Sequence, residues 1–187
     1  TGGMGKEIAR RLVSEGAAVF LGGRSADKAA AIAAEIGAAP VVLDVTSPEQ
    51  WRSAIDEIEA QAGRLDILVH AQGETVVTPF AEAGLDDFRY MMSLNAESVF
   101  IGSQAALPLM ERSGRGSIIN IGSVIQARAN ATLAAYGASK AAMTALSKAL
   151  ALHCAASGIR VNVIHPAGIL TDMLDRAIKA MDVPYAE

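Results

Sequence analysis

Short apolar runs alternate with longer amphipathic segments along the whole chain, and this alternation restricts the possible folds more than any other feature. The runs cover residues 18–21, 41–43, 67–69, 117–121 and 160–164. Each is long enough for a buried strand and too short for a helix. Strands that alternate with helices predict a parallel sheet covered by helices on both faces.

Two of the intervening segments carry clear boundary signals for helices. Ser25 is expected to cap a helix that ends before Gly37. Ser47 is a second N-cap, followed by Pro48 at the first helical position and by Gln50 where a capping box has its third helical residue. Further helices are expected before Gly16, from about residue 86 to 112, and from residue 136 to about 157.

Composition excludes several classes of protein. The 187 residues predict one domain over residues 1–187, and no apolar run approaches the roughly eighteen residues that cross a membrane. A net charge of −4 argues against a nucleic-acid partner. The single cysteine, Cys154, fits a cytoplasmic location, and no cluster of His, Cys and Asp predicts a metal site.

Polar residues follow the apolar runs at the ends where a parallel sheet binds its ligands. Because the carboxyl ends of parallel strands share one edge, these side chains are expected to lie near one another. The residues are Arg24, Asp44, His70, Gln72, Ser123, Pro166 and Thr171.

Tyr136 and Lys140 lie four residues apart on a predicted helix and therefore share one of its faces. Ser123 precedes the tyrosine by thirteen residues and ends the apolar run at 117–121. A hydroxyl, a phenol and an ammonium group placed in this way can gather around one small oxygen atom. The pair Tyr-x-x-x-Lys is a weak signal when it stands alone.

Three longer motifs give the pair its context: Gly116-Ser-Ile-Ile-Asn-Ile-Gly-Ser123, Tyr136-Gly-Ala-Ser-Lys140 and Gly158-Ile-Arg-Val-Asn162-Val-Ile-His-Pro166. In order and spacing they resemble the short-chain dehydrogenase/reductase family, and the resemblance covers nearly the whole chain. It implies an α/β fold of the Rossmann type, a doubly wound parallel sheet whose single domain carries both the NAD(P) site and the substrate site.

The resemblance also implies a role for each residue of the motifs. Tyr136 would be the general acid/base, and Lys140 would hold the nicotinamide ribose and lower the pKa of the phenol, which is ordinarily near 10. Ser123 would donate a hydrogen bond to the substrate oxygen, and Asn95 would hold a water in a proton relay. The substrate-contacting residues would be Ser123, Ile125, Gln126 and Tyr136.

The glycine loop departs from the family pattern, which is Thr-Gly, three residues, then Gly-x-Gly. Here Thr1-Gly2 is followed directly by Gly3-Met4-Gly5. Gly2, Gly3, Met4 and Gly5 would still hold the cofactor pyrophosphate. Because the family's first and last strands are missing, we expect the sequence to be incomplete at both ends, with a break between Gly2 and Gly3. A Cα–Cα distance near 3.8 Å across that bond would contradict the break, and a real deletion would put cofactor binding in doubt.

Arg24 bears on the choice of cofactor. It follows Leu21-Gly22-Gly23, where members of the family that prefer NAD carry an acid. A guanidinium suits a 2′-phosphate, so NADP(H) is favoured over NAD(H). The alternative is a solvated arginine that stacks on the adenine in an enzyme accepting either cofactor.

The remaining cofactor residues follow three further strands. Asp44 and Val45 match the family's adenine-contacting pair, although Asp44 could instead cap the next turn. The backbone of Ala71 and Gly73 would pass the adenine ribose, with His70 a structural hydrogen-bonding residue. Pro166, Ile169 and Thr171 would orient the nicotinamide carboxamide, and residues 172–187 would form a mobile lid over the substrate.

The sequence therefore predicts an NAD(P)-dependent oxidoreductase acting on a secondary alcohol or ketone. Glu97-Ser-Val-Phe-Ile-Gly102 and His165-Pro-Ala-Gly-Ile-Leu-Thr171 resemble bacterial hydroxysteroid dehydrogenases. A 3-oxoacyl thioester is the alternative substrate, and an NAD(P)-binding regulator or scaffold without turnover is the alternative function. By resemblance, the helices at 86–112 and 136–157 would form the interface of a homodimer or homotetramer.

Overall fold

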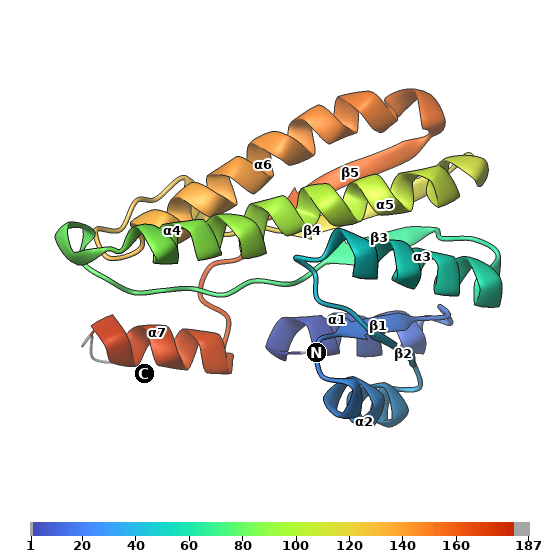
Figure 1. The fold of residues 1–187 in the computed structure, drawn as a ribbon, viewed down its shortest axis with the longest axis horizontal. Coiled ribbons are helices and arrows are strands. Elements are labelled where there is room, and N and C mark those ends of the chain that lie inside the picture. Colours follow the sequence, from blue (N-terminus) through green and yellow to red (C-terminus); the bar gives the residue numbers. More distant parts are fainter. Residues whose placement is uncertain (1, 182–187) are drawn as a thin grey trace.

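The computed structural model describes residues 2–181 and contains five strands and seven α-helices (Figure 1). The strands are β1 (Phe20–Gly23), β2 (Ala39–Val42), β3 (Ile67–His70), β4 (Gly116–Ile121) and β5 (Ile159–Ile164). The helices are α1 (Gly3–Ser14), α2 (Ala26–Ile36), α3 (Pro48–Ala62), α4 (Leu85–Met92), α5 (Ser98–Arg112), α6 (Ala134–Cys154) and α7 (Asp172–Met181). Short helical turns are η1 (Phe80–Glu82), η2 (Ser93–Glu97), η3 (Val124–Gln126) and η4 (Ala155–Ser157).

All strand pairs are parallel, as the alternation predicts, but they form two sheets instead of one. β1 pairs with β2, while β3, β4 and β5 form a second sheet in that order. Among residues 2–181, no backbone ladder joins β1 to β3. In Figure 1, α5 and α6 lie with β3, β4 and β5 in the upper part of the molecule, α1 and α2 lie with β1 and β2 in the lower part, and α3 lies between the two groups.

A shared hydrophobic core, rather than backbone hydrogen bonds, joins the two sheets. Val41 of β2 and Leu68 of β3 belong to one buried cluster, and Trp51 of α3 packs between them and α5. A second, smaller cluster holds α1 and α2 on β1. Side-chain packing thus fixes the cofactor-side strands relative to the strands that carry the predicted catalytic residues.

The predicted helix caps are largely confirmed. The Ser25 side chain accepts a hydrogen bond from the Lys28 backbone N–H, and Gly37 adopts the left-handed conformation with a φ of 79°. Ser47 accepts from the Gln50 N–H, but the reciprocal half of the capping box is wrong. The Ser47 N–H already donates to the Asp44 carbonyl at 3.0 Å, so the Gln50 side chain turns to the Asp44 N–H at 2.6 Å.

The long predicted helix at 86–112 is interrupted near its middle. Residues Ser93–Glu97 form a π-helical turn between α4 and α5. Such turns contain one extra residue and are frequent at functional sites. Asn95 lies within the turn and is 1% exposed. The interruption therefore occurs at the one residue of this helix to which the sequence assigned a role.

The chain runs from Gly2 into α1, and the predicted break between Gly2 and Gly3 stays a prediction. Gly2 is the N-cap, and its carbonyl accepts from the Lys6 N–H at 3.2 Å, as in the first turn of a regular helix. Part of the predicted lid is the helix α7, while residues 182–187 lie outside the described residues. None of the described helices is both long and apolar enough to cross a membrane.

Candidate active site

Tyr136, Lys140 and Ser123 come together at the carboxyl end of β4. Lys140 projects from α6, and its Nζ donates to the carbonyl of Ile121, the last residue of β4, at 2.8 Å. Ser123 lies two residues further on and caps η3, with its Oγ accepting from the Ile125 N–H at 3.3 Å. The Lys140 Nζ is 5.8 Å from the centre of the Tyr136 ring. The structure therefore brings together the three side chains that the sequence grouped.

Burial controls the charge state of both α6 residues. It raises the pKa of Tyr136, and a hydrogen-bonding interaction with Ser123 partly opposes that rise. The pKa of Lys140 falls to about 8 because a buried ammonium loses its hydration. Lys140 is not among the causes that shift the pKa of Tyr136, the largest of which is desolvation; its ammonium donates to the Ile121 carbonyl instead.

Asn95 connects the loop after β3 to α6. Its Nδ2 donates to the Glu74 carbonyl at 3.1 Å and to Ser139 Oγ at 3.0 Å, while its Oδ1 accepts from the Glu74 N–H at 3.2 Å. Ser139 in turn donates to the Tyr136 carbonyl at 2.7 Å. The protein itself thus uses both amide hydrogens of Asn95, and a relay water would have to bind its main-chain carbonyl or the remaining lone pair of Oδ1.

The predicted pyrophosphate residues lie at the start of α1 and face the loops after β3 and β5. A Cβ on Gly3 would lie 2.8 Å from Thr171 Cγ2, and one on Gly5 would lie 3.6 Å from Ala71 Cβ. The Gly2 cap makes no side-chain hydrogen bond, and the first turn of α1 contains no acid. A helix N-terminus with these properties can accept a phosphate, because its backbone N–H groups are not neutralised.

Gly73 extends this row of cofactor residues to the catalytic side chains. A Cβ at this position would lie 3.2 Å from Asn95 Oδ1 and 3.3 Å from Lys140 Nζ. The approach is tight enough that any other residue here would require Asn95 or Lys140 to shift by a few tenths of an ångström. The loop after β3 therefore lies near Gly5 of α1 at Ala71 and near Lys140 at Gly73.

Asp44 confirms the alternative expectation that it caps a turn. Its Oδ1 accepts from the Thr46 N–H at 3.0 Å and from Thr46 Oγ1 at 2.7 Å. These bonds, and to a smaller extent the nearby charge of Arg24, lower the pKa of Asp44. The next residue, Val45, directs its carbonyl to Trp51 Nε1 at 2.9 Å. An adenine contact by Asp44 stays a prediction, as does phosphate binding by Arg24.

His70 is a buried hydrogen-bonding residue, as predicted, and is 1% exposed. The Gln72 amide nitrogen lies 3.3 Å from Nδ1, and Nε2 lies 3.2 Å from Ser103 Oγ. Because Nδ1 accepts from an amide, the ring proton is assigned to Nε2, which donates to Ser103. Burial lowers the pKa of His70 to about 4, so the ring is neutral at neutral pH.

The residues after β5 connect this strand to both sides of the site. The Pro166 carbonyl accepts from the Val124 N–H at 3.1 Å, which fixes it beside Ser123. Thr171 Oγ1 donates to the Ile169 carbonyl at 3.2 Å and accepts from the Leu174 N–H at 3.3 Å. Thr171 therefore caps α7 while its methyl group faces Gly3, a position from which it could contact a cofactor.

The predicted substrate residues divide into two groups. Ile125 and Gln126 line a cavity of about 520 Å³, whereas Ser123 and Tyr136 are not part of its wall. On α6 the cavity is bordered by Gly137 and similar small residues, one position and hence about 100° around the helix from Tyr136. The full lining is Phe80, Ile125, Gln126, Ala127, Ala129, Asn130, Ala131, Leu133, Ala134, Gly137, Ala138 and Ala141.

Sequence reasoning did not identify Glu74, which holds Asn95 through its backbone. Glu74 also forms an ion pair with Arg176, 102 residues away in the sequence. Its position directly after Gly73 is the one feature of the local sequence that could have identified Glu74. No periodic pattern relates two residues so far apart, and their contact becomes visible only in three dimensions.

The chain matches known proteins over nearly its full length. The family model described as short chain dehydrogenase matches residues 1–182. A 3-alpha-(or 20-beta)-hydroxysteroid dehydrogenase of Mycobacterium tuberculosis is 38% identical over 175 residues, which cover 92% of this chain and 67% of that protein. A 3-beta-hydroxysteroid dehydrogenase of Comamonas testosteroni is 37% identical over 180 residues, with 94% and 70% covered.

A solved structure agrees in fold. The crystal structure of a short-chain dehydrogenase from Streptomyces avermitilis superposes with a TM-score of 0.85 at 31% identity, covering 92% of this chain and 65% of that one. The chain thus spans about two thirds of the length of the proteins that it matches.

Proposed function

The chain belongs to the short-chain dehydrogenase family, and we propose that it is an NAD(P)-dependent oxidoreductase that interconverts a secondary alcohol and a ketone. The observation that carries the proposal is the grouping of Ser123, Tyr136 and Lys140 at the end of β4. Lys140 is anchored there by the Ile121 carbonyl, and Ser123 interacts with the phenol. Burying an ammonium group costs free energy, and this cost favours a functional role for Lys140.

The bound nicotinamide would supply or take up the hydride, and the side chains of the chain would manage the proton. In reduction, Tyr136 would give its phenolic proton to the substrate oxygen, while Ser123 would donate a hydrogen bond to that oxygen as negative charge develops. The raised pKa of Tyr136 keeps the phenol protonated, as a proton donor requires. Lys140 would hold the ribose hydroxyls and stabilise the phenolate that remains.

The residues at the other end of the site fit a dinucleotide. The start of α1, which no side chain caps, would receive the pyrophosphate, and Thr171, opposite Gly3, would contact the nicotinamide amide. Arg24 lies near enough to Asp44 to help lower the pKa of its carboxyl group. It directly follows β1, whose last residues include no acid. We therefore favour NADP(H) over NAD(H).

The names of the relatives support a cyclic secondary alcohol as the substrate. Two hydroxysteroid dehydrogenases share 37% and 38% identity with this chain, and their substrates carry the hydroxyl group on or beside a ring system. The proposal extends to a homodimer or homotetramer assembled through α4–α5 and α6, and to a cytoplasmic location.

The second candidate is an NAD(P)-binding regulator without turnover. The loop after β3 counts slightly for it, because the side chains of His70 and Gln72 are occupied by Ser103 and Ser98. The intact Ser123, Tyr136 and Lys140 count against it. A 3-oxoacyl thioester reductase remains the alternative for the substrate.

The test follows the absorbance of NADPH and NADH with a panel of cyclic ketones, steroids and 3-oxoacyl thioesters. Tyr136→Phe is expected to lower kcat/KM by about 10² to 10⁴, because it removes the proton donor without changing the shape of the ring. Tyr90→Phe is the matched control, since Tyr90 lies exposed on α4 and should keep the parent rate. Cofactor binding without oxidation across the panel would favour the regulator, and an unchanged rate in Tyr136→Phe would contradict the mechanism.

A further inference from the structure

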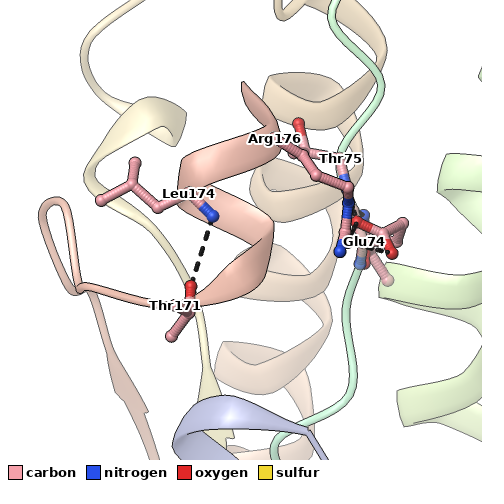
Figure 2. A network of polar contacts seen from close by, with 6 residues as sticks. Glu74, Thr75, Thr171, Leu174 and Arg176 are labelled. Carbon is pink, nitrogen blue, oxygen red and sulfur yellow. Dashed lines mark hydrogen bonds and ion pairs between the residues drawn. The ribbon is translucent and has the colours of Figure 1, made fainter. Parts of the chain in front are cut away.

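Glu74 contacts two separate parts of the molecule. Its backbone N–H and carbonyl form a pair of hydrogen bonds with the Asn95 amide, at 3.2 and 3.1 Å. Its carboxylate receives Arg176 Nη2 from α7, at 3.0 Å to each oxygen (Figure 2). Oε1 also accepts from the Thr75 N–H at 3.1 Å, which holds the carboxylate against its own loop. One residue therefore connects α7 to Asn95.

Helix α7 has few other attachments to the described protein. Ala177 is its one buried residue among positions 172–181. Its first turn is capped by Thr171, and Figure 2 shows Arg176 reaching from the next turn across to Glu74. Among residues 2–181, and apart from the Thr171 cap, the pair with Glu74 is the one side-chain hydrogen-bonded contact that α7 makes, so it can set where the helix rests.

The loop beside Glu74 also borders the catalytic side chains. The backbone of Gly73 approaches Asn95 and Lys140 so closely that an added Cβ would lie 3.2 Å from Oδ1 and 3.3 Å from Nζ. A shift of Glu74 by a few tenths of an ångström would therefore change the space beside Lys140. This one loop therefore contacts both α7 and the catalytic residues.

We propose that Glu74 is a positioning residue, whose ion pair with Arg176 closes α7 against the site and thereby fixes the loop that orients Asn95 and borders Lys140. This inference rests on the proposed function. The side chains of Glu74 and Arg176 are 34% and 61% exposed, so salt screens the pair and its contribution is modest. A contact of this strength can open to admit the substrate and then close again, which a fully buried pair could not do readily.

The experiment compares the full chain with Glu74→Gln, Arg176→Gln and the double variant. Lys179→Gln is the matched control, because it removes the same charge from the same helix and leaves the ion pair intact. Hydrogen exchange over residues 172–181 is measured without substrate, and kcat and KM are measured at low and at high salt. The double variant tests whether the two residues act through each other.

Both single variants are expected to speed exchange in α7 about two- to fivefold, the range of an exposed ion pair, and the double variant to go no further. KM should rise by a similar factor with a smaller change in kcat, and high salt should bring the parent toward the variants. The charge swap Glu74→Arg with Arg176→Glu should restore part of both effects. A purely structural role would show the salt dependence and the rescue in the exchange of α7 but not in KM.

Each contrary result has a separate meaning. Unchanged α7 exchange in Glu74→Gln and Arg176→Gln would overturn the closing role of the ion pair. Faster exchange with unchanged kcat and KM would overturn the positioning role. An inactive parent would refute the proposed function, while the exchange data would still decide whether Glu74 holds α7.

Discussion

Lys140 is the most expensive side chain of the site to bury. It is 4% exposed, and the Ile121 carbonyl is its one hydrogen-bond acceptor among the described residues. Removing an ammonium group from water costs several kcal/mol, of which one hydrogen bond returns only a part. Because the pKa of about 8 still leaves most of the group charged at pH 7, the molecule retains a buried positive charge next to Tyr136 at the expense of stability.

Burial of neutral His70 should make the stability of the folded protein sensitive to acid. The pKa is about 4 in the folded protein and near 6.5 in the unfolded chain, so the unfolded state binds more protons between these values. The free energy of unfolding should therefore fall as pH drops from 6.5 toward 4, by about 2 to 3 kcal/mol. His70→Asn should remove this part of the slope in urea titrations at pH 7 and 4.5.

The control for this prediction is His153→Asn, since His153 lies exposed near the end of α6. It should leave the pH dependence of the parent unchanged. If His70→Asn lost as much stability on acidification as the parent, burial of the neutral ring would not be the cause.

At the residue scale, the sequence could predict groupings that local geometry sets. Tyr136 and Lys140 share a face because four residues complete about one helical turn, and Ser123 follows a strand whose end is visible as an apolar run. The Asp44–Thr46 turn is local and was predicted as an alternative. The Glu74–Arg176 ion pair was not predicted, because it depends on how α7 folds back.

At the scale of the element, the helix boundaries were predictable and the π-helical turn was not. Ser25, Gly37 and Ser47 act on their own backbone neighbours, so their effects are contained in a few residues of sequence. The turn at Ser93–Glu97 is associated with tertiary contacts, because Asn95 reaches both the loop after β3 and α6. The first strand also begins two residues later than predicted, at Phe20 instead of residue 18.

The packing of α5 on α3 gives a prediction for Gly102. A Cβ there would lie 2.5 Å from the Trp51 ring and 2.6 Å from the His70 ring, so α5 would have to move outward. Gly102→Ala should destabilise the protein by about 1 to 3 kcal/mol, despite the roughly 1 kcal/mol that alanine gains in a helix. Urea unfolding followed by Trp51 fluorescence measures the change.

Gly137→Ala on α6 is the matched control for this substitution. Its Cβ would meet the Ile125 carbonyl at an ordinary 3.7 Å, so helix propensity should dominate and stability should stay equal or rise. Equal effects of the two substitutions would show that the close approach at Gly102 does not limit the packing.

At the scale of the whole molecule, the α/β class and the parallel strand direction followed from the alternation of elements. The division into two sheets fits the expectation that the family's central first strand is missing, since β1 and β3 share no backbone ladder among the described residues. The common core around Trp51 compensates, because it packs β2, α3 and α5 together with β3, β4 and β5.

Exposed apolar side chains on the α4–α5 surface predict self-association. Leu85, Phe88 and Phe100 are 61%, 42% and 51% exposed, an arrangement that a second copy of the chain could cover. Phe100→Glu should shift the mass measured by light scattering toward the monomer, because a charge would be buried in the interface. Val42→Glu on β2 is the control, since Val42 is similarly exposed at 56% but lies on another element. A monomeric parent at micromolar concentration would contradict the prediction.

The π-helical turn also sets how far α4 is rotated relative to α5 about their common helix axis. Each residue advances an α-helix by about 100°, so the extra residue rotates α4 relative to α5 by that amount. As a result α4 packs on α6 while α5 packs on α3. Deleting one residue between 93 and 97 would restore a regular helix but would turn α4 away from α6. The fold therefore constrains the number of residues in this segment more strictly than it constrains the identity of most of them.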